Sequence, residues 1–275
     1  FIVVIPLLRN INVKFYNNLK ISIITASLNN FKTIDGCISS LVNQTYNDIE
    51  HIIIDGDSHD GSKGYLEQYA KLRANVTYHS EPDLGIYHAL NKGVAMATGD
   101  IIGFLHADDQ FSSSNAIQSI VDQFKLSNAY GVYGDLEYVS QNDISKVIRY
   151  WKCKPFQDTL LKKGWMPAHP TLYLKKELYD TYGNFNTNYN IAADYEFILR
   201  LFKQKELTFS YLPNTLVKMR LGGISNASMR NIWTKTREDY KALRFHKVPN
   251  SLWVLALKNY SKFKQFDNSV YNFFF

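Results

Sequence analysis

The sequence predicts an α/β fold with a mostly parallel sheet flanked by helices and with a helical tail at its C-terminal end. Short apolar runs rich in β-branched residues alternate with amphipathic helical patterns through the first half of the chain. Such unbroken apolar runs are typical of parallel strands that are covered on both faces. A polar cluster follows each run directly, and a mixed basic and aromatic segment closes the chain.

Three strands and two helices are expected in the first half. The apolar runs lie at 20–26 (KISIITA), 51–55 (HIIID) and 100–105 (DIIGFL). Between them, apolar residues recur at the spacing of one helix face, at Ile34, Ile38, Leu41 and Val42 and at Ile86, Leu90, Val94 and Ala97. This alternation of strand and helix indicates a doubly wound parallel sheet.

The second half shows less regular patterns. An amphipathic helix is expected over 116–126, two strands of a hairpin over 131–139 and 144–151, and another helix over 193–204. From about residue 229 to the end the pattern is helical, with Trp, Tyr and Phe among Lys and Arg. No internal repeat or low-complexity linker interrupts the chain, so we expect one main domain with a helical tail.

Charge and cysteine content exclude several classes of protein. The net charge is +6, without a Lys/Arg block or a nucleic-acid-binding pattern, so we expect no nucleic-acid partner. This balance favours phosphorylated small molecules or anionic lipid headgroups, unless it reflects only a basic solvated surface. Cys37 and Cys153 stand outside metal-binding spacing, and no apolar run reaches the length of a membrane span. We therefore expect a cytoplasmic protein.

Polar clusters follow all three expected strands. The first strand leads to a loop with Thr25, Ser27 and Asn29, and the second leads to the segment DGDSHDG with Asp55 and Asp57. The third leads to HADD, residues 106–109. Open α/β sheets bind ligands at the carboxyl ends of their parallel strands, so we expect these clusters to form one binding site.

Asp108 and Asp109 form an acidic pair directly after a buried strand. Adjacent carboxylates there repel each other and lose hydration, unless a cation or hydrogen-bond donors compensate. Carboxylate oxygens select hard cations such as Mg²⁺ or Mn²⁺, which commonly bring a phosphate with them. The alternative is a turn or cap ahead of the helix expected near Asn115.

The segment DGDSHDG permits three interpretations. Its carboxylates Asp55, Asp57 and Asp60 can accept hydrogen bonds from a base or ribose, or the segment can be a polar turn. With His51 and His59 they also resemble the ligand cluster of a two-metal hydrolase. His51 and Asp55 stand four apart on one strand, however, so one metal does not easily bind both.

Three later residues are candidates for chemistry. Asp194 lies at the start of its expected helix and on the apolar face, so it either caps the helix or points into a cavity as a base. Its neighbour Glu196 pairs with Arg200 one turn later, and we expect that pair at the solvated surface. His169 lies between prolines in WMPAHP, and Arg220 precedes a Gly-Gly turn suited to phosphate.

Together these stretches resemble the family 2 glycosyltransferases, inverting enzymes with the GT-A fold, and among them the subgroup that builds bacterial capsule, O-antigen or colanic-acid-type polysaccharides. The matching stretches, over roughly residues 20–226, are ISIITASLNN, HIIIDGDSHDGS, SEPDLGIYHALNKGVAMATGDIIGFLHADD, AHPTLY, YGNFNTNYNIAADYEFILRL and RLGGIS. The resemblance implies a catalytic domain over 1–228, with a nucleotide-binding half at about 20–110 and an acceptor half at about 111–228. A helical extension over 229–275 would follow it.

The resemblance also implies roles for individual residues. Asp194 matches the general base, and Asp108 matches the ligand of Mn²⁺ or Mg²⁺. The first position of the metal motif is often Asp in this family and is His106 here, which can still act as a ligand. His169 and Arg220 would lie on the acceptor or phosphate side. The residues implied in nucleotide or donor binding are Thr25, Ser27, Asn29, Asp55, Asp57, Asp83, Asn91, Lys92, His106, Ala107, Asp108 and Asp109.

The reaction implied is transfer of one sugar, with inversion, from a nucleotide-sugar donor to an acceptor hydroxyl. By family habit the donor is a UDP-sugar, and the acceptor is a saccharide or an undecaprenyl-diphosphate-linked chain. The basic, aromatic tail is expected either to contact the inner face of the cytoplasmic membrane peripherally or to pack on the domain as a helical lid. The alternatives are a metal-dependent phosphohydrolase, which lacks a complete ligand set, and a non-catalytic nucleotide-sugar-binding protein, which has no use for Asp194. The oligomeric state stays open.

Overall fold

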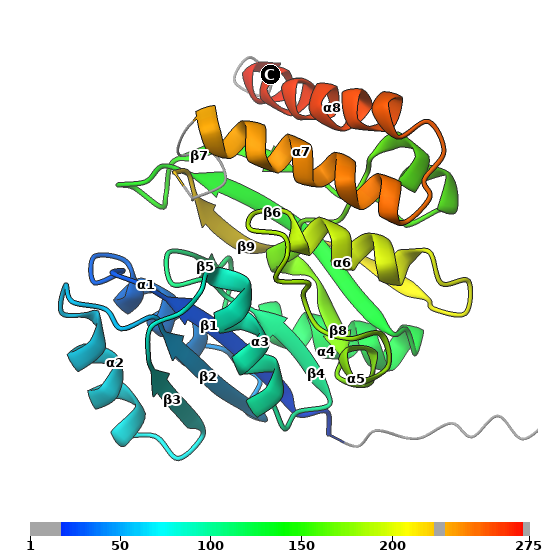
Figure 1. Ribbon diagram of the computed structural model, residues 1–275. Coiled ribbons are helices and arrows are strands. Elements are labelled where there is room, and N and C mark those ends of the chain that lie inside the picture. Colours follow the sequence, from blue (N-terminus) through cyan, green and yellow to red (C-terminus); the bar gives the residue numbers. More distant parts are fainter. Residues whose placement is uncertain (1–17, 223–228, 272–275) are drawn as a thin grey trace, which may run out of the picture.

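The computed structural model describes residues 18–222 and 229–271, whose strands form one nine-stranded sheet (Figure 1). The sheet order is β3-β2-β1-β4-β8-β6-β9-β5, and β7 pairs with β6 beside this path. The strands are β1 (Ile21–Ser27), β2 (Ile49–Asp55), β3 (Val76–Ser80), β4 (Ile101–Phe104), β5 (Gln110–Phe111), β6 (Gly131–Val139), β7 (Val147–Trp151), β8 (Tyr173–Lys175) and β9 (Phe209–Arg220).

The first half of the sheet is parallel, as the sequence predicts. β1 pairs in parallel with β2 and with β4, and β2 pairs in parallel with β3. The three expected strands are therefore confirmed as β1, β2 and β4. β3 was not expected, because its side chains are all partly or fully exposed, and it has no unbroken apolar run.

The second half of the sheet is mixed. β6 pairs in parallel with β9 and antiparallel with β7 and β8, so the predicted hairpin of β6 and β7 is present. β8 also joins β4, which connects the two halves into one sheet. The predicted α/β class is confirmed, with the parallel pairs concentrated in the first half.

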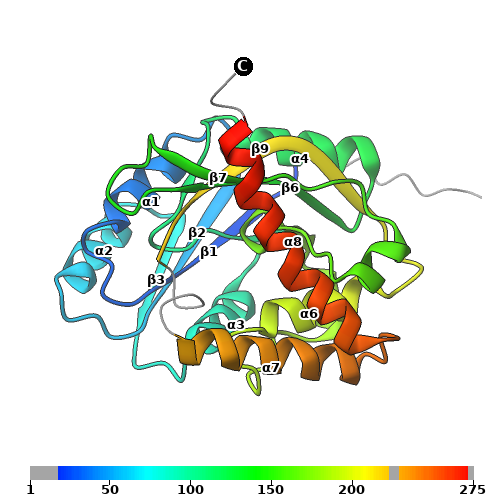
Figure 2. The ribbon, with the colours of Figure 1, turned by 90° about the horizontal axis from the view of Figure 1, so that it is seen from above.

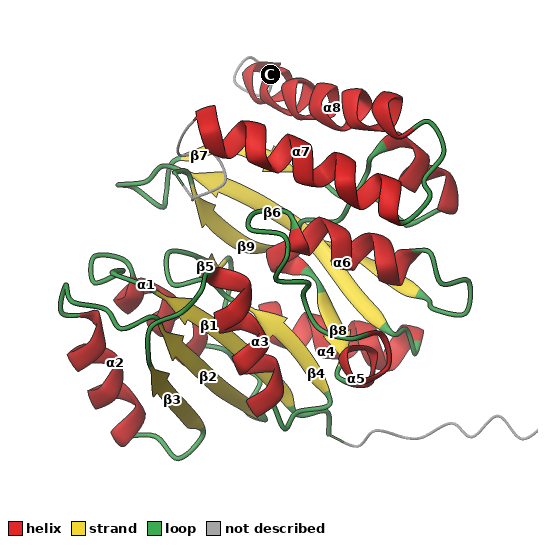
Figure 3. Ribbon diagram, in the orientation of Figure 1, coloured by secondary structure: helices red, strands yellow, loops and turns green. Residues whose placement is uncertain are grey.

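Helices cover both faces of this sheet. α3 and α6 lie on one face, and α1 and α4 lie on the other (Figures 1 and 2). The helices are α1 (Ile34–Val42), α2 (Ser62–Lys71), α3 (Ile86–Met96), α4 (Ala116–Ser127), α5 (Glu177–Tyr182), α6 (Ala193–Phe202), α7 (Met229–Phe245) and α8 (Ser251–Tyr271), with short 3₁₀ turns η1 (Asp158–Lys163) and η2 (His169–Thr171). Figure 3 shows how these helices enclose the strands.

The C-terminal tail is helical and packs on the rest of the chain. α7 lies along α6, and α8 contacts α7, β7 and η1 (Figures 1 and 3). His246 Nε2 in the tail lies 2.7 Å from Oε1 of Glu196. The predicted pair of Glu196 with Arg200 is present, but its predicted surface position is wrong, because the tail leaves Glu196 only 1% exposed. None of the described helices combines the length and the apolar character that a membrane span requires.

His51 of β2 lies in the core of the first half. Its Nε2 is 2.9 Å from Oγ1 of Thr25, and its Nδ1 is 3.3 Å from the hydroxyl of Tyr69. Burial lowers the pKa of His51 to about 3. The imidazole is therefore neutral in the folded protein at pH values where an unfolded chain would protonate it.

This burial predicts an acid-sensitive contribution to stability. Because the folded pKa is depressed, the unfolded state binds one more proton between about pH 6.5 and pH 3, so stability falls as the pH falls through that window. Between pH 6 and pH 4 the free energy of unfolding of wild type should fall more steeply than that of His51→Gln. We expect the two slopes to differ by about 1.4 kcal/mol per pH unit. Urea unfolding at each pH measures the slopes, with His79→Gln as the control because His79 is exposed. Equal slopes for wild type and His51→Gln would contradict this account.

Candidate active site

The polar loops after β1, β2 and β4 meet at one edge of the sheet. Ser27 lies opposite Asp55 in the parallel register, and the N–H of Leu105 donates to the carbonyl of Ile24 at 3.1 Å. The first two loops are also joined directly. Asn29 donates its N–H to Oγ of Ser58 at 2.8 Å and accepts the N–H of His59 on its Oδ1 at 2.9 Å. The expected convergence of the three clusters is therefore present.

Asp55 holds this edge together from inside. Its fully buried carboxylate accepts the hydroxyl of Ser58 at 2.6 Å, the N–H of Ser58 at 3.0 Å and the hydroxyl of Ser80 at 2.8 Å. These bonds leave little capacity for a nucleoside, although a role in nucleoside binding stays a prediction. Thr25 is likewise fully buried and contacts His51, whereas Ser27 Oγ is buried without a hydrogen-bond partner among the described residues.

Asp57 is a partly exposed carboxylate of this loop. Its φ of 64° places it in the left-handed region, which is uncommon for a residue with a side chain. Its Oδ1 lies 2.7 Å from Nζ of Lys63, and this hydrogen bond lowers the pKa of Asp57. A ribose or base can compete for this exposed pair at low cost, because surface ion pairs contribute little to stability.

The segment from β3 into α3 brings another charged group to the edge. Nζ of Lys92 lies 2.7 Å from Oδ1 of Asp83 and also pairs with Glu81. Nδ1 of His88 is 2.9 Å from the same Asp83 oxygen. Asp83 and Lys92 are thus paired with each other, and their role in donor binding stays a prediction.

Asn91 points elsewhere. It donates to the carbonyl of Phe185 at 2.9 Å and accepts the N–H of Phe185 at 3.0 Å. This pair of bonds ties α3 to the segment before α6. The structure therefore gives Asn91 a joining role between the two halves of the chain.

Asp108 and Asp109 have different environments. Asp109 is 1% exposed, and its Oδ1 accepts the N–H of Arg220 at 3.3 Å. Burial and the neighbouring charge of Asp108 raise the pKa of Asp109 well above its ordinary value. Asp108 is only half-buried, so it is the member of the pair that can reach a ligand. Neither residue caps α4, because β5 and the N-cap Asn115 intervene.

Arg220 lies beside this pair at the end of β9. Its Nη1 donates to the carbonyl of Gln141 at 2.9 Å, in the turn between β6 and β7. Within the described residues its Nε is buried without a partner. The expected phosphate turn continues through Gly223, which lies outside the described residues.

Three segments far apart in the sequence converge around His106. Its ring centroid lies 6.2 Å from that of His169, which stacks on Phe104 at 5.5 Å. Burial lowers the pKa of His106, while the negative charges of Asp108 and Asp194 oppose that shift. His106 therefore lies within electrostatic reach of both the predicted metal ligand and the predicted base.

His169 is a neutral group in this cluster. Burial lowers its pKa to about 4, with Asp194 opposing and His106 reinforcing the shift. Neither ring nitrogen has a hydrogen-bond partner among the described residues. A neutral imidazole offers one donor and one acceptor, so it can bind a hydroxyl group in either direction.

Asp194 lies in the first turn of α6 and is half-buried. Burial favours a raised pKa, but the positive charges of His169 when protonated, Lys235 and Lys258 outweigh it, and the pKa of Asp194 is lowered. The carboxylate is therefore ionised at neutral pH, as a base must be. The alternative role as a helix cap is not seen, since α6 has Ala192 as its N-cap and no side-chain cap bond.

Two residues near the predicted general base Asp194, Tyr87 and Glu238, were not expected from the sequence. The hydroxyl of Tyr87 lies 2.7 Å from the carbonyl of Ile191 and 3.1 Å from Oδ1 of Asp194, and its single proton can serve one of them at a time. Glu238 of α7 accepts backbone N–H groups just before α6. The available signal was that Glu238 and Asp239 are the only acidic residues between Met229 and Gln265, in a strongly basic segment.

The possible metal-binding side chains favour a cation that is shared with phosphates over one that is coordinated by protein groups alone. No group of three or more His, Cys, Asp or Glu side chains within the described ranges is placed to hold a metal ion. The hydrolase cluster is therefore not formed, and His51 is in the core. Asp108 and His106 offer two donors. That number fits Mg²⁺ or Mn²⁺, which can take their other ligands from phosphates and water.

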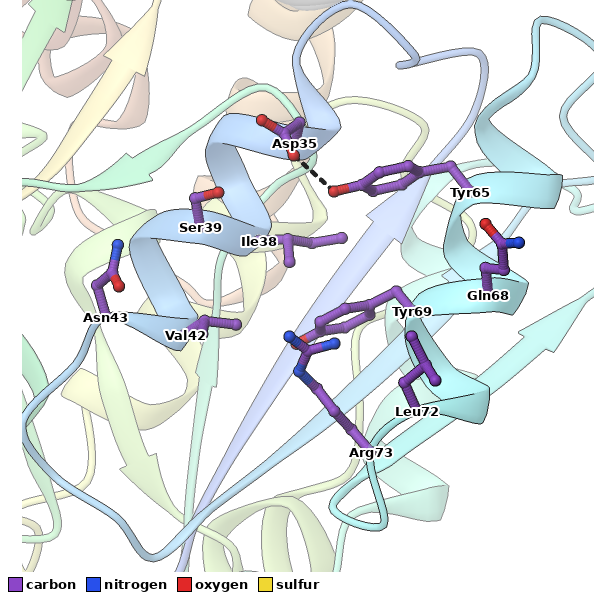
Figure 4. A pocket seen from close by; sticks show the side chains of 10 residues that line it. All are labelled: Asp35, Ile38, Ser39, Val42, Asn43, Tyr65, Gln68, Tyr69, Leu72 and Arg73. Atoms are coloured by element: carbon purple, nitrogen blue, oxygen red, sulfur yellow. Dashed lines mark hydrogen bonds between the residues drawn. The ribbon is translucent and has the colours of Figure 1, made fainter.

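A separate pocket lies between α1 and α2, away from these residues (Figure 4). Its volume is about 350 Å³, and at one end the Tyr65 hydroxyl donates to Asp35 at 2.6 Å. None of the predicted site residues lines it. We assign the chemistry to the strand-end cluster, because buried polar atoms without partners among the described residues, such as those of His106 and His169, lie there.

Comparisons with known proteins match this architecture. A family profile described as Glycosyl transferase family 2 matches residues 22–194. The PGL/p-HBAD biosynthesis glycosyltransferase of Mycobacterium bovis is 29% identical over 210 residues, which cover 74% of this chain and 78% of that protein.

Two solved structures share the fold. The crystal structure of S. aureus TarS 1–349 has a TM-score of 0.63 at 16% identity, covering 87% of this chain and 70% of that one. TarS 1–349 is also known in complex with UDP-GlcNAc. The mannosyltransferase PcManGT from Pyrobaculum calidifontis, in complex with GDP-Man and Mn²⁺, has a TM-score of 0.64 at 18% identity, covering 88% of this chain and 69% of that one.

Proposed function

The chain belongs to glycosyl transferase family 2, and from this premise we propose that it moves one sugar from a nucleotide-sugar donor to an acceptor hydroxyl with inversion at the anomeric carbon. The observation that carries the proposal is the convergence on His106. Asp108, His169 and Asp194 come from three separate segments, and the charges of Asp108 and Asp194 both act on this one imidazole. A metal-bound diphosphate and a base that deprotonates the acceptor require such proximity.

The donor is proposed to be a nucleoside diphosphate sugar, with UDP as the first candidate. The TarS complex contains UDP-GlcNAc, and the PcManGT complex contains GDP-Man. In this chain the strand-end edge offers Asp57, Lys63 and Asn29 toward a nucleoside, and Lys92 and Arg220 as cations. These groups suit a ribose at one end and phosphates at the other.

Asp108, with His106 beside it, is proposed to hold Mn²⁺ or Mg²⁺ against the diphosphate. A divalent cation there supplies Lewis-acid stabilisation of the leaving group's negative charge. Asp109 supports the site without binding the ion, because its carboxyl is buried and holds the backbone of Arg220. Arg220 itself adds a fixed positive charge at the end of β9.

Asp194 is proposed to act as the general base. It accepts the proton of the acceptor hydroxyl while that oxygen forms its bond to the anomeric carbon, and the bond from that carbon to the diphosphate breaks. A single displacement of this kind inverts the anomeric centre. The neutral His169 has both ring nitrogens free of partners among the described residues, so it can orient the acceptor hydroxyl or a sugar hydroxyl.

The acceptor is proposed to be a saccharide or an undecaprenyl-diphosphate-linked chain at the inner face of the cytoplasmic membrane. The outer surface of the tail supports a membrane location. Trp233 and Trp253 are 68% and 65% exposed. Cations are exposed between them, whereas Glu238 and Asp239, the two acidic residues between these tryptophans, are buried. Exposed indoles among unopposed cations suit an anionic interface.

The base assignment predicts a selective loss of turnover. Asp194→Asn should lower kcat by about 10²–10⁴-fold, because the amide cannot accept the proton, and should leave nucleotide affinity within about threefold. The assay is nucleotide release from UDP-GlcNAc, UDP-glucose and GDP-mannose with octyl glycosides as acceptors. Calorimetry gives the affinities for UDP and GDP. Wild-type turnover in this variant would exclude Asp194 as the base.

The metal assignment predicts a different phenotype. Asp108→Ala should remove most of the gain in UDP affinity that Mn²⁺ or Mg²⁺ produces in wild type, because the cation loses its carboxylate ligand. Calorimetry with each cation and with EDTA measures that gain for UDP and for GDP. Asp180→Ala is the matched control, since Asp180 is exposed on α5. The assignment fails if metal-dependent affinity in Asp108→Ala equals that of the control.

The tail surface predicts binding to anionic lipid. Arg237→Ala with Arg244→Ala should weaken binding to vesicles containing phosphatidylglycerol by roughly thirtyfold, at about 1 kcal/mol for each cation. Vesicle sedimentation measures the affinity, with phosphatidylcholine vesicles for comparison. Lys125→Ala with Lys205→Ala is the control pair, because these exposed cations lie outside the tail. Equal binding by both double variants would refute the tail as the contact surface.

A further inference from the structure

The C-terminal tail contacts the segment before Asp194 through the carboxylate of Glu238. Glu238 of α7 accepts the N–H of Asn190 on Oε1 at 2.8 Å and the N–H groups of Ile191 and Ala192 on Oε2, each at 2.9 Å. These are three consecutive backbone donors, and the last belongs to the N-cap of α6. Asp194 follows two residues later.

No other group satisfies these donors in the described part of the chain. Helix N-termini leave their first N–H groups without intrahelical partners, and a side-chain oxygen at the N-cap normally accepts one of them. The N-cap of α6 is Ala192, which has no such oxygen. Glu238, which lies more than forty residues away and is only 8% exposed, instead binds the N–H of Ala192 and of the two residues before it, so it fixes the chain where it enters α6.

A second tail contact lies on the other side of Asp194. Nζ of Lys258 in α8 is 2.8 Å from Oδ1 of Asp239 in α7, and both side chains are almost fully buried. The same Nζ lies 3.0 Å from the ring centroid of Tyr195. The residue after Asp194 therefore packs against an ion pair that joins the two tail helices.

Opposite the tail, α3 contacts the same short segment. The hydroxyl of Tyr87 reaches the carbonyl of Ile191 and the carboxylate of Asp194. The backbone of Ile191 is thus held at its N–H by Glu238 and at its carbonyl by Tyr87. Together, these contacts leave the start of α6 little freedom to shift.

We propose that Glu238 is a positioning residue for Asp194, so that the C-terminal helices form part of the active site rather than an accessory to it. This inference rests on the proposed role of Asp194 as the base. A base must lie within hydrogen-bond reach of the acceptor hydroxyl, and a displacement of about 1 Å can cost about a hundredfold in rate. The hydrogen bonds of Glu238 go to residues 190–192 and not to the loops after β1, β2 and β4, which build the nucleotide end of the site.

The test compares Glu238→Gln with Glu177→Gln in the full chain. In Glu238 one carboxylate oxygen accepts the N–H of Asn190, and the other accepts the N–H groups of Ile191 and Ala192. The amide of Gln has only one acceptor oxygen, so it can replace one of these two oxygens but not both. Glu177 is an exposed glutamate on α5 and serves as the matched control. For each variant, kcat and KM are measured with UDP-GlcNAc, UDP-glucose and GDP-mannose, and UDP and GDP affinities are measured by calorimetry. Should Glu238→Gln fail to fold, Glu238→Asp retains the charge on a shorter side chain and is measured in the same way.

We expect kcat to fall at least tenfold in Glu238→Gln, with nucleotide affinity within twofold of wild type and no change in Glu177→Gln. In the background of Asp194→Asn, the same substitution should change the residual rate less than twofold, because the two residues act as a unit. A kcat within twofold of wild type overturns the inference. So does a parallel fall in kcat and nucleotide affinity, or a full further loss in the Asp194→Asn background.

The two levels of the proposal fail in different ways. Wild-type kcat in Asp194→Asn alone refutes the base and, with it, the positioning role. A large loss in Asp194→Asn together with wild-type kcat in Glu238→Gln refutes only the positioning role.

Discussion

The parallel pairing of β1 with β2 and β4 is the constraint on which the site depends. Side-by-side parallel strands end at the same edge, so the loops at Asn29, at Asp57 and at Asp108 must meet. Asp55 reinforces the edge from inside, because its buried carboxylate is satisfied by Ser58 and Ser80. Asp57 and Asp108 are only partly buried, so they remain accessible to ligands at this edge.

The acceptor side depends on contacts between distant segments. α3 holds the segment before α6 through Asn91 and Tyr87, and α7 holds it through Glu238. Asp194 is brought to His106 and His169 by this framework, and the nearby tail lysines favour its ionised form. The sheet places the strand-end loops that are proposed to bind the nucleotide, whereas packing between the two halves of the chain places Asp194. Mutations can therefore affect nucleotide binding and turnover separately.

The sequence predicts the parts of this structure that rest on local patterns. The unbroken apolar runs give β1, β2 and β4, and the polar residues that follow them give the donor edge. β3 was not predicted because its side chains alternate between partly and fully exposed. β8 and β9 were not predicted because their pairing depends on strands that are remote in the sequence. Glu196 is misjudged for a related reason: its spacing from Arg200 is right, but only the packing of the tail reveals that the pair is buried. Side-chain direction is also beyond local patterns, since Thr25 and Asn91 point into the protein.

The central claim is that the strand-end edge and Asp194 serve one reaction site. A crystal structure of the protein with UDP and Mn²⁺ tests it most directly. The account predicts a diphosphate beside Asp108, the nucleoside over the loops after β1 and β2, and the β-phosphate turned toward His106 and Asp194. Nucleotide bound between α1 and α2, or at the strand ends with its phosphates directed away from Asp108 and Asp194, would contradict it.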